Sequence, residues 1–299
     1  MSVFPFIVGA YASLPEGRER QETYYRMLAD LEWVSGIEIP YPGDLAENWQ
    51  WLLECLPQHW EASTITAIPG TMVTIGKNPR FGLASADPEG RRAALEFTER
   101  IREVVLRMAD KRGATVISRV QVHSGPTGEA HADAYLDSLG ELSEREWAGA
   151  RIVTEHCDAP REGRKPEKGF LEIDDEISIA SHTGTGIHIN WGRSCLEERD
   201  PSAPLRHVEA AARAHVLEGV LLSGAGPEAT QYGYEWIDGH LPATSDEPTS
   251  LMTLERIGEA ARAARDGGAA YLGAKICVPA RASLEERIAM IARIHDAAR

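Results

Sequence analysis

Ile187-His188-Ile189-Asn190 is a short apolar, β-branched run that ends in an asparagine, and Trp191-Gly192-Arg193 follows it directly. It is one of eight such runs, and a segment that can be helical follows each of them. The other seven are Phe6–Ala10, Val34–Ile39, Thr64–Ile68, Thr115–Val122, Arg151–Thr154, Gly219–Leu222 and Tyr271–Cys277. Strands that alternate with helices in this way predict an α/β fold with parallel strands. Eight units within 299 residues favour a (β/α)8 barrel.

An open, doubly wound sheet would show the same alternation. That alternative lacks its dinucleotide-binding fingerprint, because no GxGxxG follows the first run, which reads Val8-Gly9-Ala10-Tyr11-Ala12-Ser13. We therefore predict one barrel domain over residues 1–299. Helical periodicity is clearest in five segments: Gln21–Leu31, Arg91–Lys111, Leu205–Leu217, Leu251–Arg265 and Leu284–Ala298. Ser250 and Ser283 are predicted N-caps, the second with Glu286 in a capping box.

The connections between the predicted elements are unequal in length. Those from helix back to strand are short, whereas three from strand to helix are long, at about residues 69–90, 156–172 and 223–250. Long loops without secondary structure in compact domains are usually functional. Barrel enzymes carry their active sites at the carboxyl-terminal ends of the strands, so we expect the site on that face.

Composition excludes several classes of protein. A formal net charge of −15 argues against a nucleic-acid partner, because the chain would repel a polyanion. No apolar run is long enough to span a bilayer, and no basic segment precedes an apolar core at Met1–Pro5, so we predict neither a membrane anchor nor a signal peptide. The cysteines are widely spaced without a CxxC pair, which fits reduced thiols. We expect a cytoplasmic protein.

Charged side chains lie in or just after strands that are otherwise apolar. Glu38, Glu155 and Lys275 are of this kind, and His123 ends the fourth predicted strand. A buried charge costs several kcal/mol unless it is paired or hydrogen-bonded. Glu38, Glu155 and Lys275 are therefore either members of structural ion pairs or site residues. His123 is either a core histidine with satisfied hydrogen bonds or a site residue. His156 follows Glu155 and points to the opposite side if the strand continues.

A second set of polar and aromatic residues lies at the predicted barrel mouth. Aromatic rings pack against the C–H faces of sugars, so the set suits a carbohydrate, although each ring could also simply plug the mouth. Ser223-Gly224-Ala225-Gly226 follows the seventh strand, where barrels often bind phosphate. The residues expected to contact substrate are Tyr11, Asn190, Trp191, Arg193, Ser223, Trp236 and His240.

Four strings carry a resemblance to a known group: Thr154-Glu155-His156-Cys157-Asp158-Ala159, Ile189-Asn190-Trp191-Gly192-Arg193-Ser194, Leu222-Ser223-Gly224-Ala225 and Trp236-Ile237-Asp238-Gly239-His240-Leu241-Pro242. Through them the chain resembles an uncharacterised bacterial family of xylose isomerase-like TIM barrels. The resemblance covers nearly the whole chain. It implies the fold of sugar isomerases, sugar epimerases, inosose dehydratases and endonuclease IV.

The resemblance also implies where a metal would lie. Sugar epimerases of this superfamily hold a divalent ion with Glu, Asp, His and Glu from the last four strands. Here Glu155 matches the first ligand, but Asn190, Ser223 (or Gly224) and Lys275 stand at the other three positions. An ammonium cannot coordinate a cation, so we predict a protein that works without a metal. The alternative is a rebuilt metal site in which Glu155 is joined by His156, Asp158, His188 or His240.

We therefore expect an enzyme that transfers a proton next to a carbonyl of a sugar or sugar derivative, as an isomerase, epimerase or lyase. Glu155 would be the general base, with Glu38 or His123 as its partner, and Lys275 would stabilise the enediolate charge. Two alternatives remain. One is a non-catalytic sugar-binding or regulatory barrel with a degenerate metal site. The other is a nuclease like endonuclease IV, which the negative charge disfavours.

Overall fold

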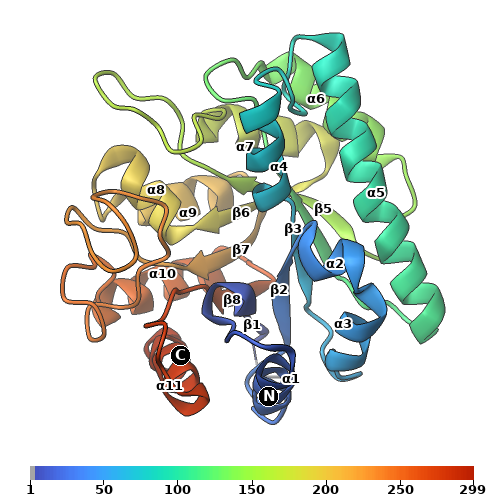
Figure 1. Cartoon of the computed structure of the whole chain (residues 1–299). Coiled ribbons are helices and arrows are strands. Elements are labelled where there is room, and N and C mark those ends of the chain that lie inside the picture. Colours follow the sequence, from blue (N-terminus) through green and yellow to red (C-terminus); the bar gives the residue numbers. More distant parts are fainter. Residues whose placement is uncertain (1–3) are drawn as a thin grey trace.

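The strands of the computed structural model, which describes residues 4–299, form one closed parallel barrel in the order β1 to β8. β1 pairs with β2 on one side and with β8 on the other, which closes the barrel. Figure 1 shows the strands at the centre and the helices around them. This arrangement confirms the predicted (β/α)8 TIM barrel. The strands are β1 (Phe6–Val8), β2 (Gly36–Pro40), β3 (Thr64–Thr66), β4 (Arg119–Val122), β5 (Arg151–His156), β6 (Gly186–Asn190), β7 (Leu217–Leu222) and β8 (Tyr271–Ala274).

The helices cover the outside of the barrel and include several that the periodicity did not predict. Among these, α8 begins directly at the end of β6, because the side chain of Asn190 accepts a hydrogen bond from the amide of Arg193 and caps it. The helices are a 3-10 turn η1 (Ala10–Ser13), α1 (Arg18–Ala29), α2 (Gly43–Glu47), α3 (Trp49–Cys55), α4 (Ile68–Lys77), α5 (Pro88–Arg112), α6 (Ala132–Ser143), α7 (Ile173–Thr183), α8 (Trp191–Glu198), α9 (Ala203–Arg213), α10 (Leu254–Asp266) and α11 (Leu284–Ala298).

Several predicted boundaries were wrong. The second strand was predicted over Val34–Ile39, but β2 begins at Gly36 and includes Pro40, which pairs with Thr66. The next N–H in the ladder comes from Tyr41, which donates to the Thr66 carbonyl at 3.0 Å. β5 extends to His156, two residues beyond the prediction, whereas β8 ends at Ala274, so that Lys275 lies just past the strand.

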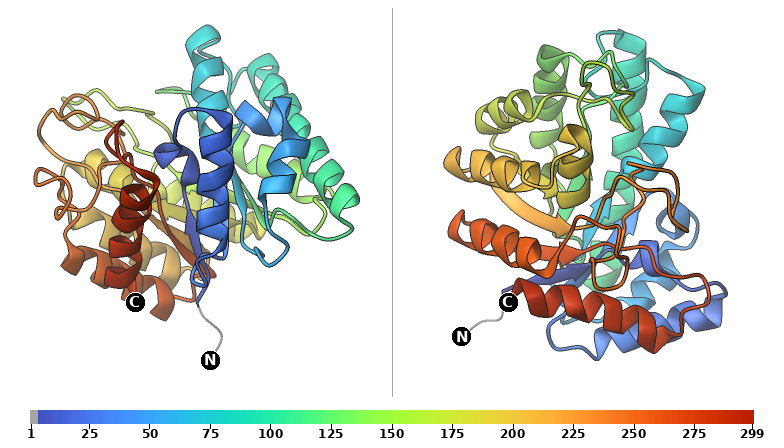
Figure 2. Two further views of the ribbon diagram at one scale, coloured as in Figure 1. Left: turned by 60° about the horizontal axis from the view of Figure 1, so that its bottom comes forward. Right: turned by 90° about the vertical axis from the view of Figure 1, so that its left-hand side faces the viewer.

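Two of the three predicted long loops are present. The segments between β5 and α7 and between β7 and α10 have no helix or strand, and Figures 1 and 2 show them projecting on the same side of the barrel. The third, at residues 69–90, was wrong, because α4 begins at Ile68 with a proline in its first turn. No helix among residues 4–299 is long and apolar enough to cross a membrane. Residues 1–3, where no signal peptide was predicted, lie outside the described range.

The two predicted helix caps had different outcomes. Ser283 caps α11 in a full capping box with Glu286, as predicted. Ser250 does not cap α10, because the chain stays irregular for three more residues and Leu251 donates its amide to the Ala225 carbonyl at 2.9 Å. Thr253 caps this helix instead, through a hydrogen bond from the amide of Arg256 to its side chain.

The interior of the barrel is layered. Ile7, Leu221 and Tyr271 form a small apolar cluster within it. The hydroxyl of Tyr271 lies 2.6 Å from Nδ1 of His188. His188 precedes Asn190 by two residues in β6, so both side chains lie on the same face of the strand. Charged side chains occupy the layer beyond this cluster, toward the carboxyl ends of the strands. The fold therefore places an apolar floor beneath a layer of buried charged side chains around Lys275, which we call the polar chamber, as inward residues of alternate strands do in such barrels.

Gly9, just after β1, lets the chain pass close to Lys275. A Cβ atom at this position would lie 2.5 Å from Cβ of Lys275. We expect Gly9→Ala to lower the free energy of unfolding by about 1–3 kcal/mol, the usual cost of overpacking. Gly76→Ala in α4 is the matched control, because its Cβ would meet nothing within 4 Å and should stabilise the helix by roughly 0.5–1 kcal/mol. Urea unfolding of both variants checks this, and equal stabilities would contradict it.

Candidate functional site

An ammonium group between two carboxylates occupies the centre of the polar chamber. Nζ of Lys275 lies 2.9 Å from Oε2 of Glu38 and 3.5 Å from Oε1 of Glu155. Glu38 comes from β2, Glu155 from β5 and Lys275 from the end of β8. Three elements far apart in sequence therefore place one cation and two anions together.

Glu155 is the most heavily bound member of this group. Its Oε1 lies 2.7 Å from Nη1 of Arg193, and its Oε2 lies 2.8 Å from Nε2 of His123. The Thr66 hydroxyl donates to the same Oε2 at 3.1 Å. With Lys275, four side chains hold this carboxylate, and its side chain is 0% exposed. A carboxylate bound this way is fixed in position and charge.

A second ion cluster joins the chamber to the two long loops. Oδ2 of Asp238 lies 3.0 Å from both Nε of Arg193 and Nζ of Lys168. Asp238 belongs to the loop after β7, and Lys168 to the loop after β5. In the same loop as Asp238, His240 places its Nδ1 2.9 Å from the Ser223 hydroxyl. Arg193 thus bridges the buried Glu155 and the covering loops.

Burial and charge act differently on the pKa values of the two chamber carboxylates. For Glu155, burial would raise the pKa, but the charges of Arg193 and Lys275 and the hydrogen bond from His123 outweigh it, so its pKa lies well below the usual range. For Glu38, burial dominates and raises the pKa although Lys275 opposes it. Burial also opposes the charge of Lys275, yet the two carboxylates raise its pKa, so the ammonium stays charged.

The chamber also contains polar atoms that lack a well-aligned hydrogen bond. Among the described residues, every fully buried side-chain atom of this kind belongs to the barrel interior, except the indole nitrogen of Trp60. Each such atom costs free energy unless a partner reaches it. Oε2 of Glu38, Oε1 of Glu155 and Nζ of Lys275 lie in ion pairs, so the unused hydrogen-bonding capacity belongs to the other atoms of this set. The atoms are Oε1 and Oε2 of Glu38, Oε1 of Gln121, Nδ1 of His123, Oε1 of Glu155, Nε2 of His188, Nδ2 of Asn190 and Nζ of Lys275, the last of which lies close to Glu38 but not in hydrogen-bond alignment.

The expected substrate-contacting residues lie in three different places. Tyr11 faces the chamber, with Nζ of Lys275 5.5 Å from its ring centroid, and Arg193, Ser223 and His240 belong to the clusters above. Asn190 caps α8 while its Nδ2 stays unpartnered. Trp191, expected at the mouth, is buried in the main hydrophobic core because it starts a helix.

Trp236 and the glycine-rich turn also depart from expectation. Trp236 lies away from the chamber, beside the guanidinium of Arg199, which is 5.4 Å from its ring centroid. The amide of Gly224 donates to the Leu241 carbonyl at 2.8 Å, and Leu241 returns the bond. That amide is therefore not available to a phosphate at the end of β7.

Three polar residues of the site were missed in the sequence. Asp238 and Lys168 lie in loops, where charges are usually solvated, and only their contact with Arg193 or with each other reveals them. Thr66 ends a short strand whose polar last residue was the available signal. Asp158 and His156 do not join Glu155: Asp158 accepts the amide of Glu167 at 2.7 Å, and His156 contacts Glu176 and Glu197.

Two groups of buried His and Glu residues have ligand atoms within 4.8 Å of one another, close enough for a metal ion. One is Glu38, Glu155 and His188 inside the barrel, and the other is His156, Glu197 and His207 outside it. The barrel group does not fit a divalent cation as it stands. The charged ammonium of Lys275 already lies between its two carboxylates, and a cation placed there would be repelled.

Removal of the central cation should destabilise the fold. Lys275→Met leaves Glu38 and Glu155 buried without their shared partner, which should lower the free energy of unfolding by about 3–5 kcal/mol. Adding Glu38→Gln to this variant removes one of the two anions and should restore part of the loss. Guanidinium unfolding of the single and double variants checks this. A double variant less stable than Lys275→Met would show that the charges are not coupled.

His240, whose side chain is 12% exposed, should make stability depend on pH. Burial lowers its pKa to about 3, with Lys275 and Arg193 adding to the effect and Asp238 opposing it. The unfolded chain takes up a proton here below about pH 6.5 and the folded chain does not, so stability falls as pH drops from about 6.5 toward 3. His240→Gln should flatten this fall by up to about 1.4 kcal/mol per pH unit. Unfolding curves at several pH values measure how the free energy of unfolding changes with pH. The same change in His240→Gln as in the wild type would contradict this prediction.

Several solved structures have the same fold as this chain. A xylose isomerase-like TIM barrel protein from Mycobacterium smegmatis in complex with magnesium superposes with a TM-score of 0.54 at 11% identity, over 98% of this chain and 97% of that one. An L-ribulose 3-epimerase superposes with a TM-score of 0.56 at 14% identity, over 100% of this chain and 91% of that one. At these identities the likeness shows the fold alone.

Sequence comparison gives closer relatives. An uncharacterised protein of Salmonella typhimurium is 32% identical over 95% of this chain and 93% of its own length. The model of one protein family, a domain of unknown function numbered DUF4862, matches residues 7–290. This chain, with its lysine-bridged pair of carboxylates, therefore belongs to the DUF4862 family of xylose isomerase-like barrels.

Proposed function

We propose that the chamber binds a sugar or sugar derivative and transfers a proton at the carbon next to its carbonyl, as an isomerase, epimerase or lyase. The observation that carries the proposal is the set of buried polar atoms around Lys275 and the two carboxylates that make neither a hydrogen bond nor an ion pair, among them Oε1 of Glu38, Nδ1 of His123 and Nδ2 of Asn190. A polyol offers hydroxyl groups that donate to carboxylates and accept from the ammonium. The fold that the chain shares with an L-ribulose 3-epimerase supports the same class of substrate.

Of the two carboxylates, Glu38 is the better proton acceptor. Among residues 4–299 its one ion pair is with Lys275, and burial raises its pKa toward the range in which general bases work best. Glu155 was expected to be the base, and that role stays a prediction. Its four contacts and lowered pKa favour a different one, in which its charge holds Arg193, His123 and Lys275 in place.

Lys275 supplies the electrostatic stabilisation. When a base takes the proton, the C–H electrons move into a carbon–carbon double bond and the carbonyl oxygen becomes an oxyanion. A charged ammonium held between fixed carboxylates stabilises that oxyanion in a buried chamber, where charges interact strongly. Returning the proton to the other carbon gives isomerisation, and returning it to the opposite face gives epimerisation. Loss of a neighbouring hydroxyl gives a lyase.

Substrate reaches the chamber only if a covering segment moves, because Glu155 and Lys275 are both 0% exposed. The loop after β7 is the segment we propose to move. Asp238 holds it to Arg193 and Lys168, and His240 holds it to Ser223, so opening the loop requires that these contacts break. Loop closure of this kind excludes water from many enzyme sites.

Glu38→Gln tests the base directly. Purified protein is incubated in deuterated water with a panel of aldoses, ketoses and sugar acids, and proton NMR follows the exchange of each C–H. We expect the wild type to exchange one carbon-bound proton of at least one sugar class. Glu38→Gln should keep the fold and lose about 10²–10⁴ in rate, because a general base is removed.

The controls separate the roles of the two carboxylates. Glu155→Gln should lower stability in addition to activity, since Arg193 and Lys275 lose their shared anion. Full exchange by Glu38→Gln with loss only in Glu155→Gln would make Glu155 the base. If the wild type exchanges no proton of any sugar class, the proposed enzyme activity is wrong.

A second candidate is a non-catalytic sugar-binding barrel. The lysine between the carboxylates favours it, because this residue replaces a metal ligand of the sugar epimerases that the chain resembles. Calorimetric binding of a sugar that undergoes no exchange, and whose affinity Glu38→Gln leaves unchanged, would establish this candidate instead.

A further inference from the structure

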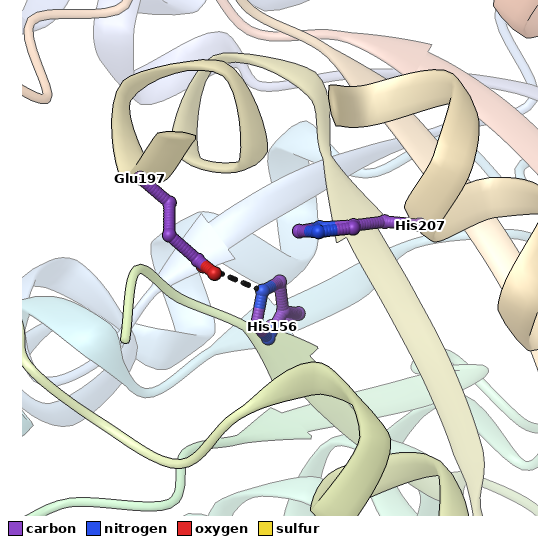
Figure 3. Close-up of side chains that lie close together, drawn as sticks. All are labelled: His156, Glu197 and His207. Atoms are coloured by element: carbon purple, nitrogen blue, oxygen red, sulfur yellow. Dashed lines mark hydrogen bonds and ion pairs between the residues drawn. The ribbon is translucent and has the colours of Figure 1, made fainter. Parts of the chain in front are cut away.

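A second polar cluster lies outside the barrel, between the strands and the helix layer. His156 at the end of β5, Glu197 of α8 and His207 of α9 point toward one another, as Figure 3 shows. Nε2 of His156 lies 3.0 Å from Oε2 of Glu197, and one ligand atom from each of the three residues lies within 4.8 Å of the others. None of the three takes part in the proposed reaction.

Each histidine of this cluster is held by a partner at its other ring nitrogen. Nδ1 of His156 lies 2.7 Å from Oε2 of Glu176, and Nδ1 of His207 lies 3.0 Å from the Ser194 hydroxyl. Contacts at Nδ1 leave Nε2 as the ring nitrogen that is available to a ligand in both histidines, and Nε2 of His156 faces Glu197. A carboxylate or hydroxyl behind a ligating histidine is the arrangement that metal sites use to orient the ring.

The charges around the cluster favour a cation. Arg161 contacts three carboxylates, those of Glu172, Glu197 and Glu198. Glu176 adds a fourth, fully buried carboxylate, and His156 is the other cation in contact when it is protonated. Glu172 and Glu198 are partly exposed to solvent, whereas the side chains of Glu176 and Glu197 are fully buried. Water therefore does not screen the charges of these two buried carboxylates.

We propose that His156, Glu197 and His207 form a binding site for a transition-metal ion of the zinc class. Two imidazole nitrogens and one carboxylate oxygen are a common zinc donor set. Ligands bonded at about 2.0 Å in a tetrahedron lie roughly 3.3 Å apart, close to the contact between His156 and Glu197. Magnesium prefers oxygen ligands alone, so this site should discriminate against it.

The site lies next to a cavity. Glu197, Asp158 and Trp236 are among the residues that line a cavity of about 370 Å³ on the side of the long loops. The amide of Ala159, which also lines it, donates to Oε2 of Glu197 at 3.1 Å. A metal held by three protein ligands keeps a fourth position open, and this cavity is where water or a small ligand would reach it.

Zinc binding to the full chain tests the proposal. Untagged protein is treated with chelator, dialysed against zinc, and its metal content is measured; a cobalt-loaded sample is examined for the visible absorption of a tetrahedral ion. We expect one zinc ion per chain, which excess magnesium does not displace. His207→Gln should lose the ion, and Ser194→Ala should weaken binding about 10–100-fold, because it removes the partner of His207.

Two control variants locate the ion. His59→Gln changes an exposed histidine, and His188→Gln changes the barrel group; both should keep zinc. Absence of stoichiometric zinc in the wild type, retention by His207→Gln, or loss in His188→Gln would each overturn the proposal. If His207→Gln fails to fold, Ser194→Ala decides, and unchanged zinc affinity in it would count against the site.

Discussion

The position of the Lys275 ammonium between Glu38 and Glu155 is the constraint on which the rest of the site depends. Neither carboxylate could remain charged at 0–1% exposure without a cation in contact, because a buried, unpaired charge costs several kcal/mol. The chain near Lys275 is adapted to it, since Gly9 leaves no side chain against its stem. The chamber is thus built around a fixed positive charge.

The same electrostatics extend to the surface loops. Arg193 contacts Glu155 on one side and Asp238 on the other, and Asp238 also contacts Lys168. Closure of the two long loops over the barrel and the ordering of the buried carboxylate are therefore coupled through one guanidinium. Movement of the loop after β7 would expose Arg193 and weaken its hold on Glu155, so an open and a closed chamber would differ in charge arrangement as well as in access.

The sequence predicted the parts of this arrangement that follow from strand periodicity. Successive residues of a strand point to opposite faces, which placed Glu155 inside the barrel and His156 outside it. Periodicity could not predict Trp191, because a helix begins at the end of β6 and turns that side chain into the core. Asp238 and Lys168 were missed for a similar reason. Loop residues have no periodicity, and only the folded loops bring them to Arg193.

The barrel shares its fold with an L-ribulose 3-epimerase, and the chemistry that we propose for it rests on the charge of Lys275. The charge state of that lysine is the most direct test. Lysine labelled with ¹³C at the ε-carbon and a Lys275→Met variant for assignment allow NMR to follow Lys275 as pH rises. The account predicts that Lys275 stays charged above about pH 10.4, where ordinary lysines titrate. Titration of Lys275 at or below that pH would contradict a permanent ammonium between the two carboxylates.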